Sequence, residues 1–300
     1  MLIYAIENYI NADSSLYANS EDGTYVLENL FNERPSFPYR TTDIGMIGSP
    51  EWICIDIGSA QWLTFAAIFN HNLTQLETAG DELRLKGCDD PCDGSAACDW
   101  DNPGCEKDLT ALPSPDCEPS CSGTQPVENF CNLYHTFNCD AAHQYWRLDM
   151  IDQANTDGFL EVGELFLGQW QYFGRGSLTN SPNWVRLTPG RDDGPVFNMN
   201  HQLTYAGQDW INYHSDAEGF TLSFTNLNDP CIVDELQVFL RTVMRAGGKF
   251  VIVPDDAMPF CYYVAIMNKR DFAHRTIYGL KELREWRLEL KTLVEGITLL

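Results

Sequence analysis

The stretch that decides the fold runs from Tyr145 to Trp170, with the sequence YWRLDMIDQANTDGFLEVGELFLGQW. From Trp146 to Met150, large apolar residues alternate with charged ones, which is the period of two expected of a strand with one buried face. Residues 155–158, Asn-Thr-Asp-Gly, are typical of a tight turn. A second apolar segment begins at Phe159. The stretch therefore predicts a strand–turn–strand unit that closes a β-rich domain.

The turn also resembles a calcium-binding loop. Counted from Gln153, residues Asn155, Asp157 and Glu164 stand at ligand positions of the helix–loop–helix calcium pattern, with Gly158 at its glycine position. The first position is Gln instead of Asp, and the flanks are predicted strands where that pattern requires helices. An ordinary turn with solvated acidic side chains is therefore favoured over a calcium site.

Composition limits the classes of partner. The chain has 300 residues, enough for two domains, and carries 43 Asp and Glu against 19 Lys and Arg. Such an acidic surface repels phosphate, which argues against nucleic acid and anionic membranes as partners. The first residues lack the pattern of a signal peptide, and no apolar run is long enough to cross a membrane. We therefore expect synthesis in the cytoplasm.

The predicted fold class is mainly all-β, with two β-sandwich domains. Residues 1–170 form the first domain, whose other strands are expected at 52–58, 61–69 and 81–86. Residues 171–183 are rich in Gly, Ser, Asn and Pro and predict a linker. Residues 184–300 form a second β-rich domain with one amphipathic helix at 230–246, because Asp229 suits the N-cap and Gly247 the C′ position.

A cysteine-rich insertion at 88–139 interrupts the first domain. It holds eight of the eleven cysteines: Cys88, Cys92, Cys98, Cys105, Cys117, Cys121, Cys131 and Cys139. Because the insertion has few large apolar residues, it needs staples to fold. Disulfides, a zinc or iron–sulfur site as cofactor, and free thiols all remain open, although the familiar paired metal spacing is absent. The other three, Cys54, Cys231 and Cys261, are predicted to be small core residues.

Catalysis is not expected. The chain contains neither a Gly-x-Ser-x-Gly elbow nor a His-Glu-x-x-His helix, and the pair Glu161 and Glu164 means little as a glycosidase dyad in so acidic a chain. His71 is predicted to be a hydrogen-bonded loop histidine. Four aromatic residues in or near loops are candidates for stacking on sugar rings, or alternatively for packing at the domain junction: Trp100, Trp170, Tyr172 and Trp184.

Five segments in order carry a resemblance to a known family. They are EWICIDIGSAQW (51–62), AIFNHNL (67–73), LRLKG (83–87), YWRLDM (145–150) and LEVGELFLG (160–168). Together they resemble a galactose-binding-like jelly roll of the discoidin type, and more narrowly the version found in tail and virion proteins of tailed bacteriophages. The resemblance covers residues 1–170 without the insertion, and it implies an antiparallel β-sandwich.

The resemblance also implies a function. We expect a structural component of a phage tail, at the tail tip or baseplate, that assembles into a ring with copies of itself and other tail proteins. It would be made in the host cytoplasm and reside in the virion. Many relatives of this fold bind sugars at one end of the sandwich, so the alternative is a carbohydrate-binding module that recognises a host-surface glycan.

Overall fold

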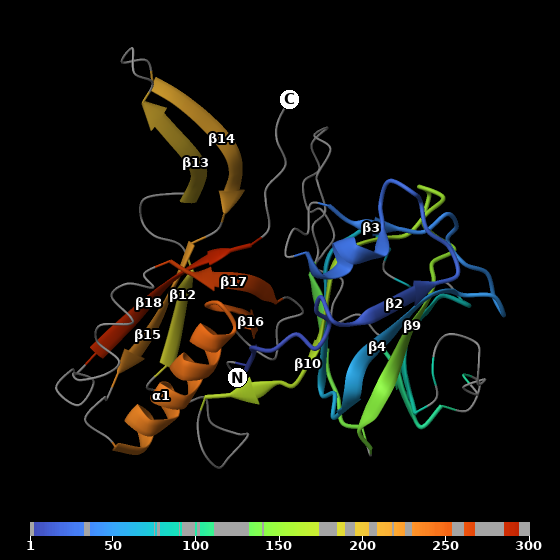
Figure 1. The fold of residues 1–300 in the computed structure, drawn as a ribbon, viewed down its shortest axis with the longest axis horizontal. Helices are drawn as coiled ribbons and strands as arrows, with labels where there is room; N and C mark the ends of the chain where they lie inside the picture. The colour runs from blue at the N-terminus through green and yellow to red at the C-terminus, as the bar shows by residue number, and fades with distance from the viewer. Residues whose placement is uncertain are drawn as a thin grey trace. The chain divides into compact units, whose positions relative to one another are not determined.

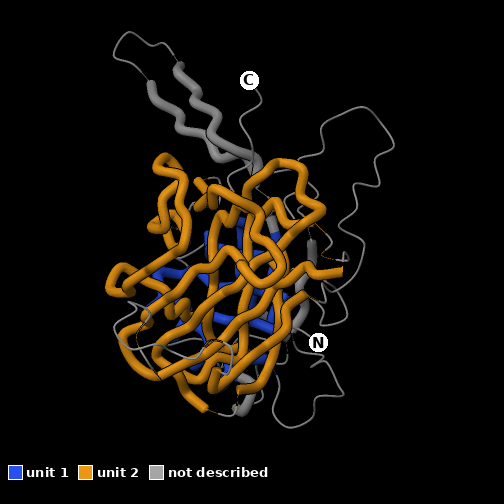
Figure 2. The backbone as a smooth tube through the Cα atoms, turned by 90° about the vertical axis from the view of Figure 1, so that its right-hand side faces the viewer, with its two compact units in different colours: residues 1–6, 171–256, 262–300 blue, residues 7–170, 257–261 orange. Residues whose placement is uncertain are grey.

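The computed structural model describes most of the chain, namely residues 3–32, 37–74, 76, 79–89, 91, 100, 103–110, 132–139, 141–173, 185–189, 196–203, 209–217, 219–225, 230–253, 261–267 and 285–293. The chain divides into two compact units, coloured separately in Figure 2. Unit 1 comprises residues 1–6, 171–256 and 262–300, and unit 2 comprises residues 7–170 and 257–261. The protein is mainly β, as predicted, and the described residues contain one α-helix.

Unit 2 is an antiparallel β-sandwich of two sheets. The five-stranded sheet has the order β2-β4-β9-β6-β7, and the four-stranded sheet has the order β3-β10-β5-β8. The strands of the first sheet are β2 (Ser15–Ala18), β4 (Glu51–Gln61), β9 (His143–Ile151), β6 (Glu82–Cys88) and β7 (Cys105–Asp108). Those of the second are β3 (Tyr39–Arg40), β10 (Glu161–Gly168), β5 (Phe65–His71) and β8 (Leu133–Thr136). A short 3-10 helix, η1 (Leu27–Phe31), precedes β3.

The core of unit 2 lies between the two sheets. Alternate residues of the central strands β4 and β9, such as Ile55 and Trp146, are paired across the ladder and fully buried. Alternate residues of β5 and β10, such as Ile68 and Leu165, are likewise paired and belong to the same hydrophobic cluster. The alternation predicted from Trp146 to Met150 is therefore confirmed, since one side of β9 faces this core.

Unit 1 contains a seven-stranded antiparallel sheet with the order β11-β1-β16-β17-β18-β15-β12. Its strands are β1 (Ile3–Ala5), β11 (Gln171–Tyr172), β12 (Val185–Pro189), β15 (Gly219–Thr225), β16 (Lys249–Val253), β17 (Tyr262–Ile266) and β18 (Glu285–Thr292). Strands β13 (Val196–Leu203) and β14 (Asp209–Ala217) form a separate two-stranded sheet. Unit 1 is therefore β-rich with one helix, as predicted for residues 184–300, and its described strands form a seven-stranded and a two-stranded sheet.

The helix α1 (Pro230–Arg245) covers the seven-stranded sheet (Figure 1), within one residue of its predicted bounds. Its apolar face is buried, and the Phe239 ring meets the rings of Phe224 and Phe250 from the sheet at 6.2 and 5.4 Å between centroids. Burial of this face stabilises the helix far more than its intrinsic propensity does. None of the described helices is long and apolar enough to span a membrane.

Two predicted boundaries differ from the structure. Residues 3–5 were expected in the first domain, but β1 pairs with β16 and with β11, so it belongs to unit 1. The expected linker 171–183 begins with β11, which pairs Tyr172 with Ile3, and Phe173 after it is fully buried. The rest of that linker lies outside the described residues. Both differences arise from backbone pairing between segments that are far apart in sequence.

Candidate functional site

Disulfides occur where the insertion meets the sandwich. Cys105 and Cys139 are joined by an S–S bond of 2.04 Å. Cys54 and Cys88 each take part in a disulfide as well. Cys54 is buried, as expected of a core residue, but its disulfide was not predicted. Cys261 is a buried free thiol, and burial raises its pKa. The predicted staples Cys92, Cys98, Cys117, Cys121 and Cys131 lie outside the described residues, and so does the side chain of Cys231.

The Cys105–Cys139 bond links the two sheets at one edge of the sandwich. Cys105 is the first residue of β7, the edge strand of the five-stranded sheet. Cys139 follows β8, the edge strand of the four-stranded sheet, by three residues. Both residues are buried and belong to the hydrophobic cluster between the sheets. The bond therefore closes a side of the sandwich where no backbone ladder can run from one sheet to the other.

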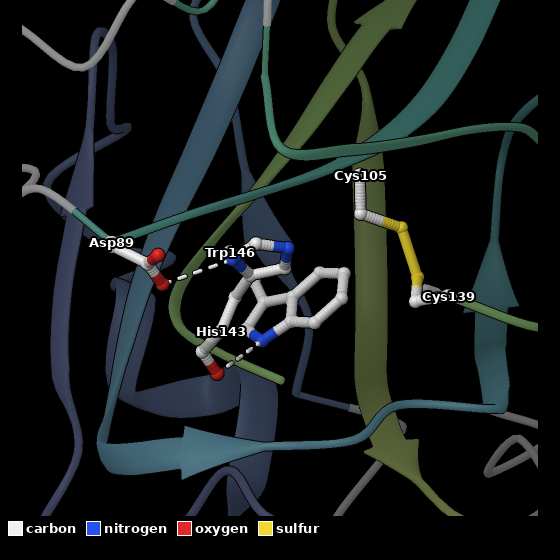
Figure 3. Close-up of a disulfide and its surroundings, with 5 residues drawn as sticks. All are labelled: Asp89, Cys105, Cys139, His143 and Trp146. Carbon is white, nitrogen blue, oxygen red and sulfur yellow. Dashed lines mark hydrogen bonds and ion pairs between the residues drawn. A yellow bond between two sulfur atoms is a disulfide. The ribbon is translucent and has the colours of Figure 1, made fainter. Parts of the chain in front are cut away.

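His143 holds the ends of the insertion in place (Figure 3). Its Nδ1 lies 3.0 Å from Oδ1 of Asp89, and its carbonyl oxygen accepts a 3.1 Å hydrogen bond from Nε1 of Trp146. Gly104 lies against the imidazole so closely that a Cβ there would be 2.5 Å from Cε1 of His143. Asp89, near the start of the insertion, and Gly104, before β7, therefore both contact the buried ring of His143.

A cluster of charges lies on the outer face of the five-stranded sheet, the face turned away from the core. Arg147 contacts Asp149 at 2.5 Å, and Lys86 contacts the same carboxylate at 2.7 Å. The guanidinium of Arg147 lies 5.1 Å from the ring centroid of Trp52 and 5.5 Å from that of Trp100. Trp100, a candidate for sugar stacking, is thus engaged by a cation–π contact and is half-buried.

An exposed tryptophan marks one end of unit 2. Trp62 follows β4 directly and is 48% exposed. Its carbonyl oxygen accepts a 3.0 Å hydrogen bond from Nε2 of Gln169, and the backbone nitrogen of Trp170 donates a 3.1 Å bond to Oγ1 of Thr64. Trp62, Gln169 and Trp170 are therefore neighbours, and we call them the tryptophan edge.

Sequence reasoning found one of the three residues of this edge. Trp170 is a predicted stacking residue, whereas Trp62 falls inside the strand predicted at 61–69 and is not among the predicted site residues. Tyr172, another candidate, is half-buried in β11 of unit 1, and Trp184 lies outside the described residues. The missed signal was Gly58, whose φ of +79° marks a bend that turns the end of β4 toward solvent.

The acidic turn is held by its own hydrogen bonds. Oδ1 of Asn155 accepts a 2.8 Å bond from the backbone nitrogen of Asp157, and Nδ2 of Asn72 donates a 3.0 Å bond to Oδ2 of Asp157. Glu164, the third predicted calcium ligand, lies inside β10 opposite Phe69 and not in the turn. Among the residues that the structure describes, no group of three or more His, Cys, Asp or Glu side chains could hold a metal ion.

Two buried titratable groups lie in the four-stranded sheet. Burial raises the pKa of Glu164 to about 9 and lowers the pKa of His71 to about 4, so both are neutral at pH 7. His71 was predicted in a loop with hydrogen bonds, but it ends β5, and neither ring nitrogen has a hydrogen-bond partner in the structure. Glu161 forms an ion pair with Arg40. Glu161 and Glu164, three residues apart on a strand, project to opposite faces and cannot act as a glycosidase dyad.

Comparisons with known proteins give structural similarity only. No known protein family and no curated protein matches the chain in sequence. A family 32 carbohydrate-binding module of NanJ from C. perfringens, solved with galactose, has 16% identity and a TM-score of 0.33 over 56% of this chain and 99% of its own.

Two further solved structures are similar to a comparable degree. A fucose-binding module from Streptococcus pneumoniae has 16% identity and a TM-score of 0.34 over 54% of this chain and 95% of its own. The lectin domain of lectinolysin, solved with Lewis B antigen, has 10% identity and a TM-score of 0.35 over 54% of this chain and 96% of its own. Scores this low say nothing about what this chain binds.

Proposed function

We propose that unit 2 is a non-catalytic module that binds carbohydrate at the tryptophan edge. The observation that carries this proposal is the exposure of Trp62, 48% of whose surface is open to solvent at a strand end. An indole has a flat apolar face on which the C–H face of a sugar ring can stack. A binding role explains why so large an apolar side chain remains at this position.

The groups beside Trp62 suit the rest of a sugar. Gln169, whose side chain donates to the Trp62 carbonyl, is exposed and carries an amide that can hydrogen-bond ring hydroxyls. Trp170 supplies a second aromatic ring from the neighbouring segment. Aromatic faces with a few fixed polar groups are the usual composition of a site that recognises a small organic ligand.

A glycan array followed by titration of the best ligand tests this function. Trp62→Ala should weaken binding about fivefold or more, because stacking on an aromatic side chain contributes about 1–3 kcal/mol where it has been measured for nucleobases. Ile47→Ala is the matched control, since Ile47 is 70% exposed and lies before the start of β4, whereas Trp62 follows its end. Absence of saturable glycan binding, or equal binding by wild type and Trp62→Ala, would refute the proposal.

A second candidate function is assembly into a phage tail, which the sequence resemblance suggests and one structural observation favours. β13 and β14 pair only with each other among the described strands. A two-stranded sheet is marginally stable alone, and its outer edges can accept further strands. We propose that neighbouring subunits or other tail proteins complete this sheet in a ring. The carbohydrate-binding module would then be carried on a virion.

Immunogold electron microscopy of lysates from producing cells tests the assembly function. Label concentrated at one end of tailed particles would support it, and native mass spectrometry should then show a closed oligomer of the purified chain. Label found on free protein alone, together with a monomeric mass, would contradict it. The glycan experiment is independent of this result, so the two functions can fail separately.

A further inference from the structure

The edge strand β7 is attached to the sandwich by few side chains. It has four residues, and Cys105 is the one among them that is buried. Its ladder with β6 runs from Arg84 opposite Asp108 to Gly87 opposite Cys105. The ion pair that crosses this ladder, Arg84 to Glu106 at 3.0 Å, is 42% and 39% exposed and is therefore screened by water. Edge strands this short are weakly held by their own hydrogen bonds.

Buried groups hold β7 at its two ends. Beyond its last residue, Leu109 is buried, and Thr110 accepts a 3.0 Å hydrogen bond from the backbone nitrogen of Leu83. At its first residue, the disulfide connects β7 to Cys139, which follows β8 in the other sheet. Gly104, just before Cys105, lies against the ring of His143, and the disulfide is the covalent attachment at this end of β7. The near end of β7 therefore depends on the oxidation state of one cysteine pair.

We propose that the Cys105–Cys139 disulfide is a redox-controlled clasp that attaches β7 to the sandwich. In the closed state the two sheets are linked at their β7 and β8 edges. A dithiol reductant opens it by transferring two electrons and two protons, which breaks the S–S bond, leaves two thiols and converts the reductant to its own disulfide. β7 then separates from β6, and the backbone groups of β6 from Arg84 to Gly87 lose their hydrogen bonds to β7.

The consequence is a module whose edge responds to its surroundings. In a reducing compartment the β6 edge is open, and in an oxidising one it is closed. Both sulfurs are buried, with Cys105 6% and Cys139 5% exposed, so the reductant reaches them only when the edge opens transiently. This inference does not depend on carbohydrate binding or on tail assembly.

Hydrogen exchange on the full chain tests the clasp. Under oxidising conditions, amides of β6 and β7 in Cys105→Ala/Cys139→Ala should exchange at least tenfold faster than in wild type, while β18 in unit 1 stays unchanged. Arg84→Ala, which removes the exposed ion pair across the ladder and keeps the disulfide, serves as the matched variant and should exchange close to the wild-type rate until dithiothreitol is added. Wild-type protection of β7 in the double variant would overturn the proposal.

A second measurement uses the wild-type chain and needs no variant to fold. Dithiothreitol is titrated, and alkylation with mass spectrometry follows the thiols of Cys105 and Cys139 while exchange follows β7. Because Cys54 and Cys88 are also disulfide-bonded, their alkylation is followed as well. The proposal requires loss of β7 protection to coincide with alkylation of Cys105 and Cys139 and not with that of Cys54 or Cys88. Full alkylation of both with β7 still protected would refute it.

Discussion

Replacing Glu164 with Gln tests the burial of a carboxyl group in the four-stranded sheet. Burial raises the pKa of Glu164 from 4.5 to about 9 in the folded protein, whereas the unfolded chain keeps the ordinary value. Between these values the folded state holds a proton that the unfolded state has lost, so stability falls as pH rises. The slope is about 1.4 kcal/mol per pH unit, which gives a loss of about 3 kcal/mol at pH 7 and about 6 kcal/mol at pH 9.

Gln has nearly the same shape as protonated Glu and no charge to lose. We therefore expect Glu164→Gln to be more stable than wild type by up to about 3 kcal/mol at pH 7 and to lack the decline toward pH 9. Urea unfolding followed by circular dichroism from pH 6.5 to 9 measures both effects. Glu161→Gln is the matched control, because Glu161 is partly exposed on the same strand and should leave the slope unchanged.

The pH range of this test is set by His71. Its pKa is lowered from 6.5 to about 4 by burial, so the unfolded state binds a proton that the folded state excludes between those values. Stability from this group is lost as pH falls through that range, which opposes the effect of Glu164. Burial lowers the pKa of His135 to about 4 as well, so it acts in the same direction as His71. Both histidine effects fade above about pH 7, where Glu164 sets the difference in slope between wild type and Glu164→Gln. Equal pH slopes for wild type and Glu164→Gln in that range would show that the carboxyl group is not buried as described.

Three further changes test other parts of unit 2. Cys105→Ala/Cys139→Ala should lower the free energy of unfolding by about 4 kcal/mol, from the 34-residue separation of the bonded cysteines, as chemical denaturation would measure; a loss near zero would mean that the bond does not constrain the unfolded chain. Arg147→Ala should lower the free energy of unfolding in chemical denaturation by about 3 kcal/mol, because the fully buried Asp149 then keeps Lys86 as its ion-pair partner but loses Arg147. Arg147→Lys should lower it by less. Gly45→Ala should strongly lower the stability in thermal unfolding, since the φ of Gly45 is +76° and a Cβ there would lie 2.6 Å from the Met150 carbonyl oxygen. Gly48 has a φ of +81° with open space around it, so Gly48→Ala should lower the free energy of unfolding by only about 1 kcal/mol. Equal costs at the two glycines would contradict the close approach at Gly45.

Local patterns predicted the elements that local forces determine. The alternation from Trp146 to Met150 marks β9 because a strand with one buried face imposes a period of two. The helix α1 was predicted within one residue, since Pro230 at its start and Gly247 beyond its end both act through the backbone of the helix itself. These signals need no knowledge of distant segments.

Features that depend on distant partners were missed. Nothing near Cys54 indicates a disulfide, because the partner of a bridge is chosen by the fold and not by spacing. The calcium-like spacing from Asn155 to Glu164 ignores that the chain enters β10 at Glu161, which removes Glu164 from the turn. Trp62 has apolar neighbours in sequence, so its exposure follows only from its position after the end of β4.

The pairing of β1 with β16 has a consequence for how the chain folds during translation. Ile3 meets Val253 in this ladder, so unit 1 encloses the whole of residues 7–170 in its sequence. The ribosome completes unit 2 almost entirely before it makes the partner of β1. Ile3 and Tyr4 can pair with β11 once residue 172 has been made, but the other side of Ile3–Ala5 stays unpaired until some 250 residues have been added. Chaperones that bind short exposed β-segments would have their longest opportunity at this site.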